Sequence, residues 1–518
     1  MKYFEKGINV PKVLLIKPKF DSGLSLLVCE IPLGLEYIAA AIESNVTHVS
    51  IVDLSHQKIS LKKEINKIKP DIMGITGQYA WHNEITRTTR VCRKIRPESI
   101  IVAGGYYPSL FPKLLDYIPE LDYIVKGEGE QTFLEICKTG IEDPYQVKGI
   151  YFRENGKIRF SGKRPAIQNL DNLKFPARKL RHKYYTHLQL PGRYYDSVST
   201  IRGCDGRCSF CCEPEMYGRA RQRSPENVIQ EIDEIVEFHQ NGPMTIICTD
   251  PNFLGRHEAD VTRINRLCEL LEEREYDLSF SLLIRADTIT RNPALIYRMV
   301  NNGFNFFEVG VETPDKTILR NTKKGQSIKT VQEAIKIITQ AGGFPVGTLM
   351  LGFPGQTEAA IRQYPVYATE ILGIREAAFV FATPIVGTGF FKEVQHLIFE
   401  NNLARFNYLH PTLQFNPQLN VNRMYFLLGY CYGGFFTPNL MKENDEFYER
   451  LIPKKTENPL LTYTKFGLKS LGEFPNKAKI EFIRGAITGF FASEKYRRKK
   501  MGKGTKVKSI DFYGQKTK

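Results

Sequence analysis

The chain has 518 residues, of which 42% are hydrophobic and 12% aromatic, enough for two or three domains with packed cores. Its net charge of +16 is uneven, because ten Lys or Arg and one acid fall within residues 495–518, and the remainder is only mildly basic. This distribution argues against a nucleic-acid-binding core. There is no run of about 18 apolar residues, and residues 1–7 lack the apolar core of a signal peptide. We therefore expect a cytoplasmic protein without a membrane span or a nucleic-acid partner.

Residues 1–150 alternate short apolar runs with helical patterns. Helices are expected at 33–42 and after 130, and the apolar runs predict strands at 13–16, 48–53, 72–76, 100–105 and 121–127. This alternation is typical of an α/β fold with a doubly wound parallel sheet of the Rossmann-like kind, covered by helices on both faces. Ligands of such sheets bind beyond the carboxyl ends of the strands, and the glycine-rich turns at 104–105 and 127–129 lie there.

Residues 151–195 are expected to form a linker, with a small hairpin signal at 154–156. Residues 196–400 again alternate, with strands predicted at 196–201, 244–248, 278–284, 306–312, 345–351 and 377–381. Six strand–helix units predict a partial (β/α)6 barrel, whose active face is the edge where the strands end. Three polar residues follow successive strands at that edge and could either form helix caps and ion pairs or line a site: Asp250, Arg285 and Glu312.

Three cysteines follow the first of these strands at the spacing C-x3-C-x2-C. They are Cys204, Cys208 and Cys211, in a short loop that is rich in glycine and charge. Three thiolates on a four-iron cluster leave one iron without a protein ligand, and that iron can be chelated by a small molecule. The loop therefore predicts an iron–sulfur centre in a reducing compartment.

A zinc site and buried structural thiols are the alternatives for this loop. Zinc usually takes four Cys or His ligands in paired short spacings, and the chain contains no second C-x2-C or H-x3-H pair. Cys212 directly follows Cys211, and neighbouring side chains rarely point the same way, so we assign Cys212 no role.

The cysteine loop, with Phe210 just before its last cysteine, is similar to the signature of radical S-adenosylmethionine enzymes. The resemblance implies that the amino and carboxylate groups of S-adenosylmethionine chelate the open iron of a [4Fe-4S] cluster, and that cleavage yields a 5′-deoxyadenosyl radical. It also implies roles in binding S-adenosylmethionine. Phe210 would lie near the adenine, Glu312 would contact the ribose or amino group, Arg285 would hold the carboxylate, and Gly352 would lie along the adenosine.

The first 150 residues resemble the cobalamin-binding domain that precedes the radical domain in one large subfamily. The similarity lies in the order of 32–35, Gly104-Gly105 and 127–130, which implies that Gly104, Gly105, Gly127, Glu128 and Gly129 contact cobalamin. The D-x-H-x-x-G motif of classical cobalamin domains is missing, since His56 in 53–58 has the wrong spacing. We therefore expect cobalamin to bind without a histidine on cobalt.

Residues 401–518 are expected to be a mainly helical region. An aromatic and apolar stretch at 422–436 predicts a packed helix, and 477–500 predicts an amphipathic helix that ends in a basic cluster. The second helix either packs on the core or lies on an anionic membrane surface, where each basic residue contributes about 1 kcal/mol.

These features together predict a cobalamin-dependent radical S-adenosylmethionine enzyme. Its first expected reaction is methylation of an unactivated carbon in a hydrophobic substrate, an isoprenoid-type lipid or a tetrapyrrole, with electrons from a flavodoxin or ferredoxin type of donor. The same subfamily, which includes hopanoid methylases, also contains ring-forming enzymes such as the anaerobic magnesium-protoporphyrin ester cyclase, so cyclisation is the alternative reaction. A noncatalytic, metal-stabilised binding protein is the alternative from another class.

Overall fold

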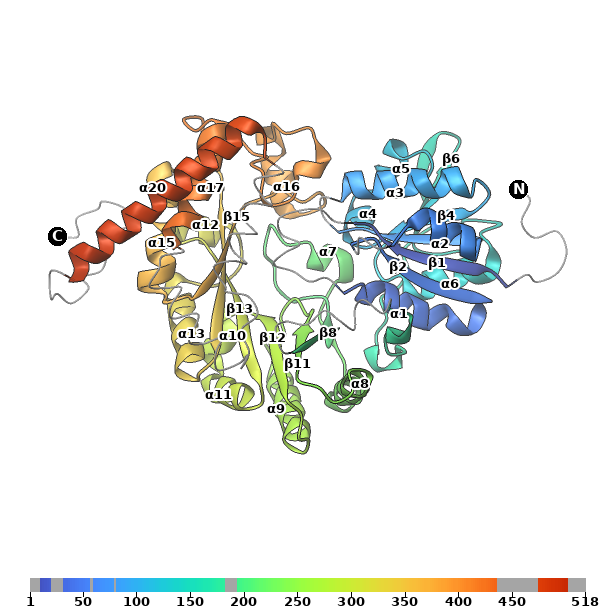
Figure 1. Ribbon diagram of the computed structural model, residues 1–518, viewed down its shortest axis with the longest axis horizontal. Coiled ribbons are helices and arrows are strands. Elements are labelled where there is room, and N and C mark those ends of the chain that lie inside the picture. Colours follow the sequence, from blue (N-terminus) through green and yellow to red (C-terminus); the bar gives the residue numbers. More distant parts are fainter. Residues whose placement is uncertain are drawn as a thin grey trace.

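The structure is a computed structural model, and it describes residues 10–19, 31–55, 59–78, 81–181, 193–435 and 474–501. For residues 491 and 493–501 it describes the backbone only. Figure 1 shows an N-terminal α/β domain beside a half-barrel, with two long C-terminal helices on the far side of the half-barrel.

The N-terminal domain contains a seven-stranded sheet in the order β2-β1-β3-β4-β5-β6-β7. Its strands are β1 (Lys12–Lys17), β2 (His48–Asp53), β3 (Ile72–Thr76), β4 (Ile100–Gly104), β5 (Tyr123–Val125), β6 (Ile150–Glu154) and β7 (Lys157–Phe160). Its helices are α1 (Leu33–Ile42), α2 (Leu61–Ile68), α3 (His82–Ile95), α4 (Tyr106–Leu110), α5 (Leu114–Tyr117) and α6 (Glu130–Thr139). The first five strands pair in parallel, which confirms the predicted doubly wound sheet.

Successive residues of β1 belong to different cores, as the period of two in a strand requires. Val13 and Leu15 pack with residues of α1 and α6 on one face of the sheet. Leu14 and Ile16 pack with residues of α2 and α3 on the other face. This is why the strand is an unbroken apolar run.

The sheet continues beyond residue 150, into the region that we expected to be a linker. β6 pairs antiparallel with β5, and β7 pairs with β6 through the turn at Asn155-Gly156. Both turn residues have positive φ, 51° and 72°, as a tight hairpin of this kind requires. The hairpin was recognised in the sequence, but its pairing with β5 is a long-range contact that a local pattern does not reveal.

The half-barrel is a parallel sheet in the order β15-β14-β13-β12-β11-β8. Its strands are β8 (Tyr194–Val198), β11 (Met244–Cys248), β12 (Leu278–Ile284), β13 (Phe304–Glu312), β14 (Phe344–Leu351) and β15 (Glu376–Phe381), which confirms the six expected units. A two-stranded ribbon of β9 (Ile201–Arg202) and β10 (Arg221–Gln222) follows β8. The helices are α7 (Glu213–Tyr217), α8 (Pro225–Phe238), α9 (Glu258–Glu272), α10 (Ala286–Arg291), α11 (Pro293–Asn301), α12 (Lys316–Asn321), α13 (Ile328–Gln340), α14 (Glu358–Ile361), α15 (Tyr364–Val366) and α16 (Gly389–Val394).

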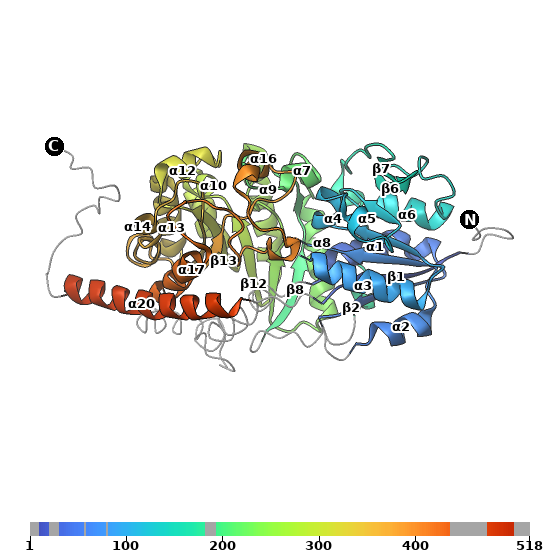
Figure 2. The same cartoon turned by 90° about the horizontal axis from the view of Figure 1, so that it is seen from above.

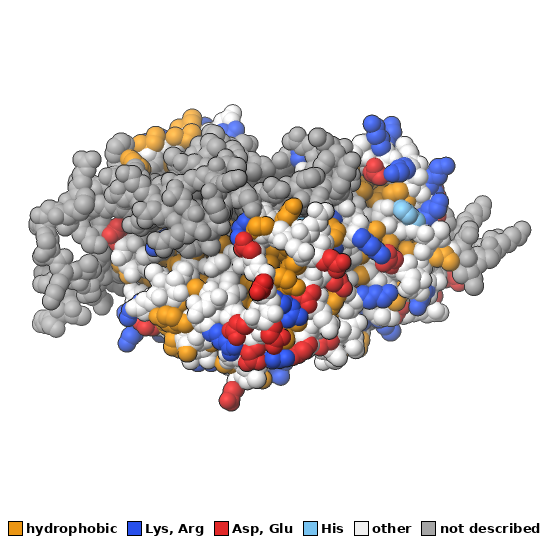
Figure 3. Space-filling view, turned by 60° about the horizontal axis from the view of Figure 1, so that its bottom comes forward, with side chains coloured by type: hydrophobic (Ala, Val, Ile, Leu, Met, Phe, Trp, Pro, Cys, Tyr) orange, Lys and Arg blue, Asp and Glu red, His pale blue; other side chains and the backbone are white. Residues whose placement is uncertain are grey.

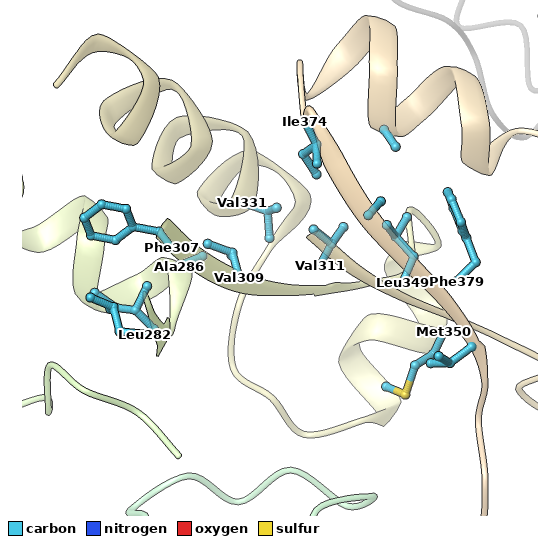
Figure 4. Close-up of a cluster of buried hydrophobic side chains, with 14 of the residues drawn as sticks. Leu282, Ala286, Phe307, Val309, Val311, Val331, Leu349, Met350, Ile374 and Phe379 are labelled. Carbon is cyan, nitrogen blue, oxygen red and sulfur yellow. The ribbon is translucent and has the colours of Figure 1, made fainter. Parts of the chain in front are cut away.

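The two faces of the half-barrel sheet differ in burial. Phe307, Val309 and Val311 of β13 are buried with Val331 of α13 and other apolar side chains (Figure 4). The residues between them, 306, 308 and 310, are only partly buried. They therefore face the concave inner side of the half-barrel.

The C-terminal helices α17 (Val421–Phe435) and α20 (Asn476–Met501) pack together through glycine (Figure 2). A Cβ added at Gly433 would lie 1.9 Å from the carbonyl oxygen of Ala486, and one at Gly485 would lie 1.9 Å from that of Phe426. Glycine therefore lets the two backbones touch. One face of α20 thus packs on the protein, which is one of the two arrangements that we expected for this helix.

The opposite face of α20 is exposed and carries an apolar stripe. Ile480, Ile483 and Ile487 are 60%, 44% and 54% exposed, at the spacing of one helix face. None of the described helices is long and apolar enough to cross a membrane.

The face drawn in Figure 3 carries acidic and basic side chains side by side. Ion pairs link the helices α8, α9 and α11, such as Arg266 with Glu226 at 2.9 Å and Arg298 with Glu272 at 3.0 Å. The described part of this face thus has mixed charge, unlike the basic stripe with which a protein follows a phosphate backbone.

Candidate functional site

The cysteine loop runs from β9 to α7 and is fixed at its base. Asp250, at the end of β11, accepts hydrogen bonds from the backbone N–H groups of Thr200 (2.7 Å) and Ile201 (2.8 Å). Gly203 has φ of 81°, and a Cβ there would lie 2.4 Å from the carbonyl oxygen of Arg219. Asp250 therefore supports the loop, and the position of Gly203 requires glycine.

Two of the three cysteine sulfurs of the loop, those of Cys204 and Cys208, lie beside Gly206. The N–H of Gly206 donates to Cys204 Sγ at 3.3 Å, and a Cβ at Gly206 would lie 3.2 Å from that sulfur and 3.9 Å from Cys208 Sγ. Among the described residues, no three His, Cys, Asp or Glu side chains are close enough to hold a single metal ion. A four-iron cluster is larger than one ion, so the thiolates that hold it lie farther apart than the four ligands of a zinc ion.

The surroundings of the thiols affect their ionisation. Burial raises the pKa of Cys204 and of Cys208, while the cations of Lys324 and Arg285 oppose this shift at Cys208. A hydrogen bond with Cys212, and then burial, raise the pKa of Cys211. The expectation that Cys212 points away from its neighbour is therefore wrong. The backbone of Cys212 is already helical at the start of α7, and this turn brings the two thiols together.

Arg285 and Glu312 lie beside the loop, together with Lys324. The guanidinium of Arg285 donates to Cys208 Sγ at 3.6 Å, to Asp287 Oδ1 at 2.9 Å and to the carbonyl oxygen of Lys324. Lys324 Nζ forms an ion pair with Glu312 and donates to the Gly310 carbonyl oxygen at 2.7 Å. Arg285 thus has three protein partners. The ammonium of Lys324 is a second cation near the loop.

Lys324 is the residue of this group that the sequence did not indicate. It lies in a loop after α12, among other charged residues, and only the fold returns that loop to the end of β13. Glu312, by contrast, ends a strand, and its φ of 63° is a left-handed conformation that is rare for glutamate. Such strain is common at functional sites.

Gly352 and Phe210 lie on the same side of the half-barrel. Gly352 has φ of 92°, its N–H donates to Gln356 Oε1 at 2.7 Å, and a Cβ would lie 3.2 Å from the ring of Phe415. Phe210 is partly buried against the core of the half-barrel. Their contacts with S-adenosylmethionine stay predictions.

A cavity of about 370 Å³ lies between the N-terminal domain and the half-barrel. The strand order 2-1-3-4-5 has its switch point between β1 and β3, and the cavity opens there, where doubly wound sheets bind ligands. All five residues expected to contact cobalamin line it: Gly104, Gly105, Gly127, Glu128 and Gly129. The half-barrel side of the cavity is formed by residues of β8, β9 and β11 and by Thr249 and Pro251.

The cavity residues fit a bulky, mostly apolar ligand. A Cβ at Gly104 would meet only Val125, at 3.8 Å, so the backbone of that turn is open to the cavity. A second cavity of about 760 Å³ shares the wall formed by Gly127, Glu128, Glu130, Met216 and Tyr217, which gives further room for a ligand as large as a corrinoid. The described lining residues include no histidine, and His56 lies outside the described residues.

The side chain of Glu128 joins the two domains. It pairs with Arg202 at 3.1 Å and with Arg221 at 2.9 Å, and Arg202 also pairs with Glu130 at 2.6 Å. Glu128 therefore lines the cavity, while its carboxylate is paired with the two arginines. Arg202 directly precedes the cysteine loop, so this ion network connects the loop with the cavity.

Comparison with known families assigns both halves of this arrangement. Residues 198–364 match the Radical SAM superfamily, and residues 23–137 match the B12 binding domain. The chain is a radical S-adenosylmethionine protein. It belongs among the members that carry a B12-binding domain, and its cofactors are a [4Fe-4S] cluster, S-adenosylmethionine and cobalamin.

Three curated relatives are similar over much of the chain. An uncharacterized methyltransferase of Pyrococcus horikoshii is 27% identical over 79% of this chain and 88% of its own. The anaerobic magnesium-protoporphyrin IX monomethyl ester cyclase of Rubrivivax gelatinosus is 24% identical, over 78% and 73%. The hopanoid C-2 methylase of Rhodopseudomonas palustris is 26% identical, over 53% and 49%.

A solved structure has the same fold. The cobalamin-dependent S-adenosylmethionine radical enzyme OxsB, with aqua-cobalamin and S-adenosylmethionine bound, superposes with a TM-score of 0.70 at 16% identity. The match covers 98% of this chain and 82% of that one. The architecture expected from the sequence, from the Rossmann-like domain to the helical C-terminal region, is therefore confirmed.

Proposed function

We propose that this cobalamin-dependent radical S-adenosylmethionine enzyme methylates an unactivated carbon of a hydrophobic substrate. The observation that carries the proposal is the cavity between the domains, which is lined both by the glycine turns of the B12-binding domain and by Ile201 and Arg202, directly before the cysteine loop. When bound, the cluster and S-adenosylmethionine supply hydrogen abstraction, and cobalamin supplies the methyl group. The methylase and methyltransferase relatives support this choice, and the cyclase relative favours ring formation as the second candidate.

The residues of the chain bind and orient the reactants. Cys204, Cys208 and Cys211 would hold the cluster. Lys324 and Arg285 place two cations beside Cys208, where they would hold the carboxylate of S-adenosylmethionine. Glu312 lies beside Lys324 and offers a carboxylate to the ribose or the amino group.

The test is anaerobic reconstitution with iron, sulfide, cobalamin and S-adenosylmethionine that carries a trideuterated methyl group, with reduced flavodoxin as the electron donor. Lipid and pigment extracts serve as the source of substrate. We expect 5′-deoxyadenosine together with a product that has gained one labelled methyl group. A product that is oxidised or cyclised without the label would favour the cyclase, and one bound zinc without iron would favour a noncatalytic binding protein.

We further propose that the enzyme collects its substrate at an anionic membrane surface through α20. The exposed stripe of Ile480, Ile483 and Ile487 supports this, since an amphipathic helix with an apolar face and nearby basic residues binds such surfaces. The basic residues 495–500 lie at the end of the helix, and those at 503–518 lie outside the described residues. Binding should weaken with salt, because the field decays over about 10 Å at 0.1 M ionic strength.

Replacing Ile483 and Ile487 with serine tests the membrane proposal better than truncation, because removing α20 would expose the glycine face of α17. We expect the double variant to sediment less with vesicles of anionic lipid at low salt than the unchanged chain does. Tyr117 and Tyr297, exposed on other elements (53% and 42%), serve as controls when changed to serine. Equal sedimentation of all variants, or no salt dependence, would contradict the proposal.

A further inference from the structure

One carboxylate on the inner face of the half-barrel, that of Glu308, forms no ion pair with any described residue. Glu308 of β13 is paired in register with Leu283 of β12 and with Val346 of β14, and Val346 is paired with Glu376 of β15. Paired residues of parallel strands share a face, so these four side chains form one row across the inner face. The row is apolar except for its two carboxylates.

Glu308 has a single hydrogen-bond donor, the hydroxyl of Thr348, at 2.9 Å from Oε1. Among the residues that the structure describes, no Lys, Arg or His nitrogen lies within 4.0 Å of its carboxylate. Burial first, and then repulsion from Glu376 and Glu312, raise the pKa of Glu308, while the hydrogen bond from Thr348 and the nearby ammonium of Lys324 oppose this shift. A carboxylate accepts about four hydrogen bonds, and a partly buried one that has a single donor is stabilised less than one that is fully paired. An apolar residue would be more stable there, unless a ligand supplies the partner.

The row lies between the two cofactor sites. Two residues further along β13, about 7 Å away, the Lys324 ammonium contacts the carbonyl oxygen of Gly310 beside the cysteine loop. In the other direction, Thr249 lines the cavity between the domains. It directly follows β11, whose last pair is Cys248 with Leu282, so it lies about 10 Å from Glu308 across two strand spacings. A substrate that reacts with both cofactors must lie in this space.

On the basis of the proposed function, we propose that Glu308 binds a protonated nitrogen of the substrate. The substrate is then an apolar molecule with one amine or similar basic group, whose skeleton contacts Leu283 and Val346. A cation is favoured over a hydroxyl because Glu308 forms no ion pair with a described residue, and the nearby ammonium of Lys324 is already paired with Glu312. Glu308 is thus a specificity-determining residue, which fixes the carbon that faces both cofactors.

The test compares 2-phenylethylamine with its neutral counterpart 2-phenylethanol, by calorimetric titration of the enzyme loaded with cluster, cobalamin and S-adenosylmethionine. The unchanged enzyme should bind the amine more tightly than the alcohol. Glu308→Gln keeps an oxygen for Thr348 but removes the charge, and should weaken amine binding about 10-fold or more, the size expected for a hydrogen bond to a charged group. Binding of the alcohol should not change. The control is Glu273→Gln at an exposed glutamate, which should leave both affinities unchanged.

Equal affinity for the amine and the alcohol, or an unchanged amine affinity in Glu308→Gln, would overturn the inference. Weaker binding of S-adenosylmethionine itself in that variant would also overturn it, because Glu308 would then belong to the cofactor site. Cobalamin absorbance and circular dichroism show whether the variant is folded. Transfer of the labelled methyl group without amine selectivity would refute only this inference, whereas amine selectivity without any methyl transfer would refute only the proposed reaction.

Discussion

In each of three variants, in which Cys204, Cys208 or Cys211 is replaced with alanine, the visible absorbance of the iron–sulfur cluster should be lost and S-adenosylmethionine cleavage should fall to background. Each substitution removes one of the three thiolates that would hold the cluster and leaves only two. Iron content, absorbance after anaerobic reconstitution and 5′-deoxyadenosine formation measure the effect. Cobalamin binding should survive in all three variants, since its cavity does not include the cysteines.

Cys212→Ala is the matched control for these variants. Cys212 is buried and hydrogen-bonds with Cys211, so its loss should alter the surroundings of one ligand but leave the cluster and the cleavage activity in place. If Cys212 proved indispensable while Cys204 did not, the assignment of the ligands would be wrong.

The strands of both domains were predictable because they carry strong local signals. β1 and β14 are apolar runs bounded by turns, and the glycines after β4 and β5 mark the edge where a ligand binds. The pairing of β6 and β7 with the first sheet was not predictable, because the short hairpin has no signal that chooses its neighbour. The contact between α17 and α20 was not predictable either, because nothing in the sequence shows that the glycines of the two helices face each other.

The site was predictable where a motif has fixed spacing, and not where the fold assembles it. The cysteine loop is contiguous in the chain, so three residues sufficed to indicate it. Lys324 and Glu308 have no such spacing. Lys324 reaches the site from a loop, and Glu308 appeared in the sequence as one acid within an apolar strand. Glu128 was recognised as part of a glycine turn, but its pairing with Arg202 and Arg221 depends on the contact between domains.

The two domains are joined by a buried ion network centred on Arg181. Its guanidinium bonds to Glu36 of α1 in the N-terminal domain, at 2.5 and 3.0 Å, and to Asp196 of β8 in the half-barrel, at 2.5 and 2.7 Å. His239 also bonds to Asp196, at 2.9 Å. The side chain of Arg181 is 1% exposed and those of both carboxylates 0%, so none of these charges can turn to solvent.

Arg181→Met should therefore destabilise the protein strongly, by about 3–5 kcal/mol, because it leaves two buried carboxylates without their shared cation. Arg266→Met is the matched control. It breaks an exposed pair with Glu226, in which the side chains are 44% and 54% exposed, and should cost at most about 1 kcal/mol. Denaturant unfolding of both variants, followed by circular dichroism and by cobalamin binding, measures the difference. Equal losses in the two variants would mean that the buried network does not hold the domains together.

The same network predicts how stability depends on pH. Burial alone would raise the pKa of Asp196, but Arg181, Arg178 and the hydrogen bond from His239 outweigh it and hold that pKa well below its usual range. A carboxyl whose pKa is lowered by folding contributes stability that is present above its unfolded pKa, about 3.9, and is lost as the pH falls toward its folded pKa. Arg181→Met removes the largest of the lowering interactions, so the variant should begin to unfold at a higher pH than the unchanged chain. Coincident acid-unfolding curves for the two proteins would show that Asp196 does not depend on Arg181.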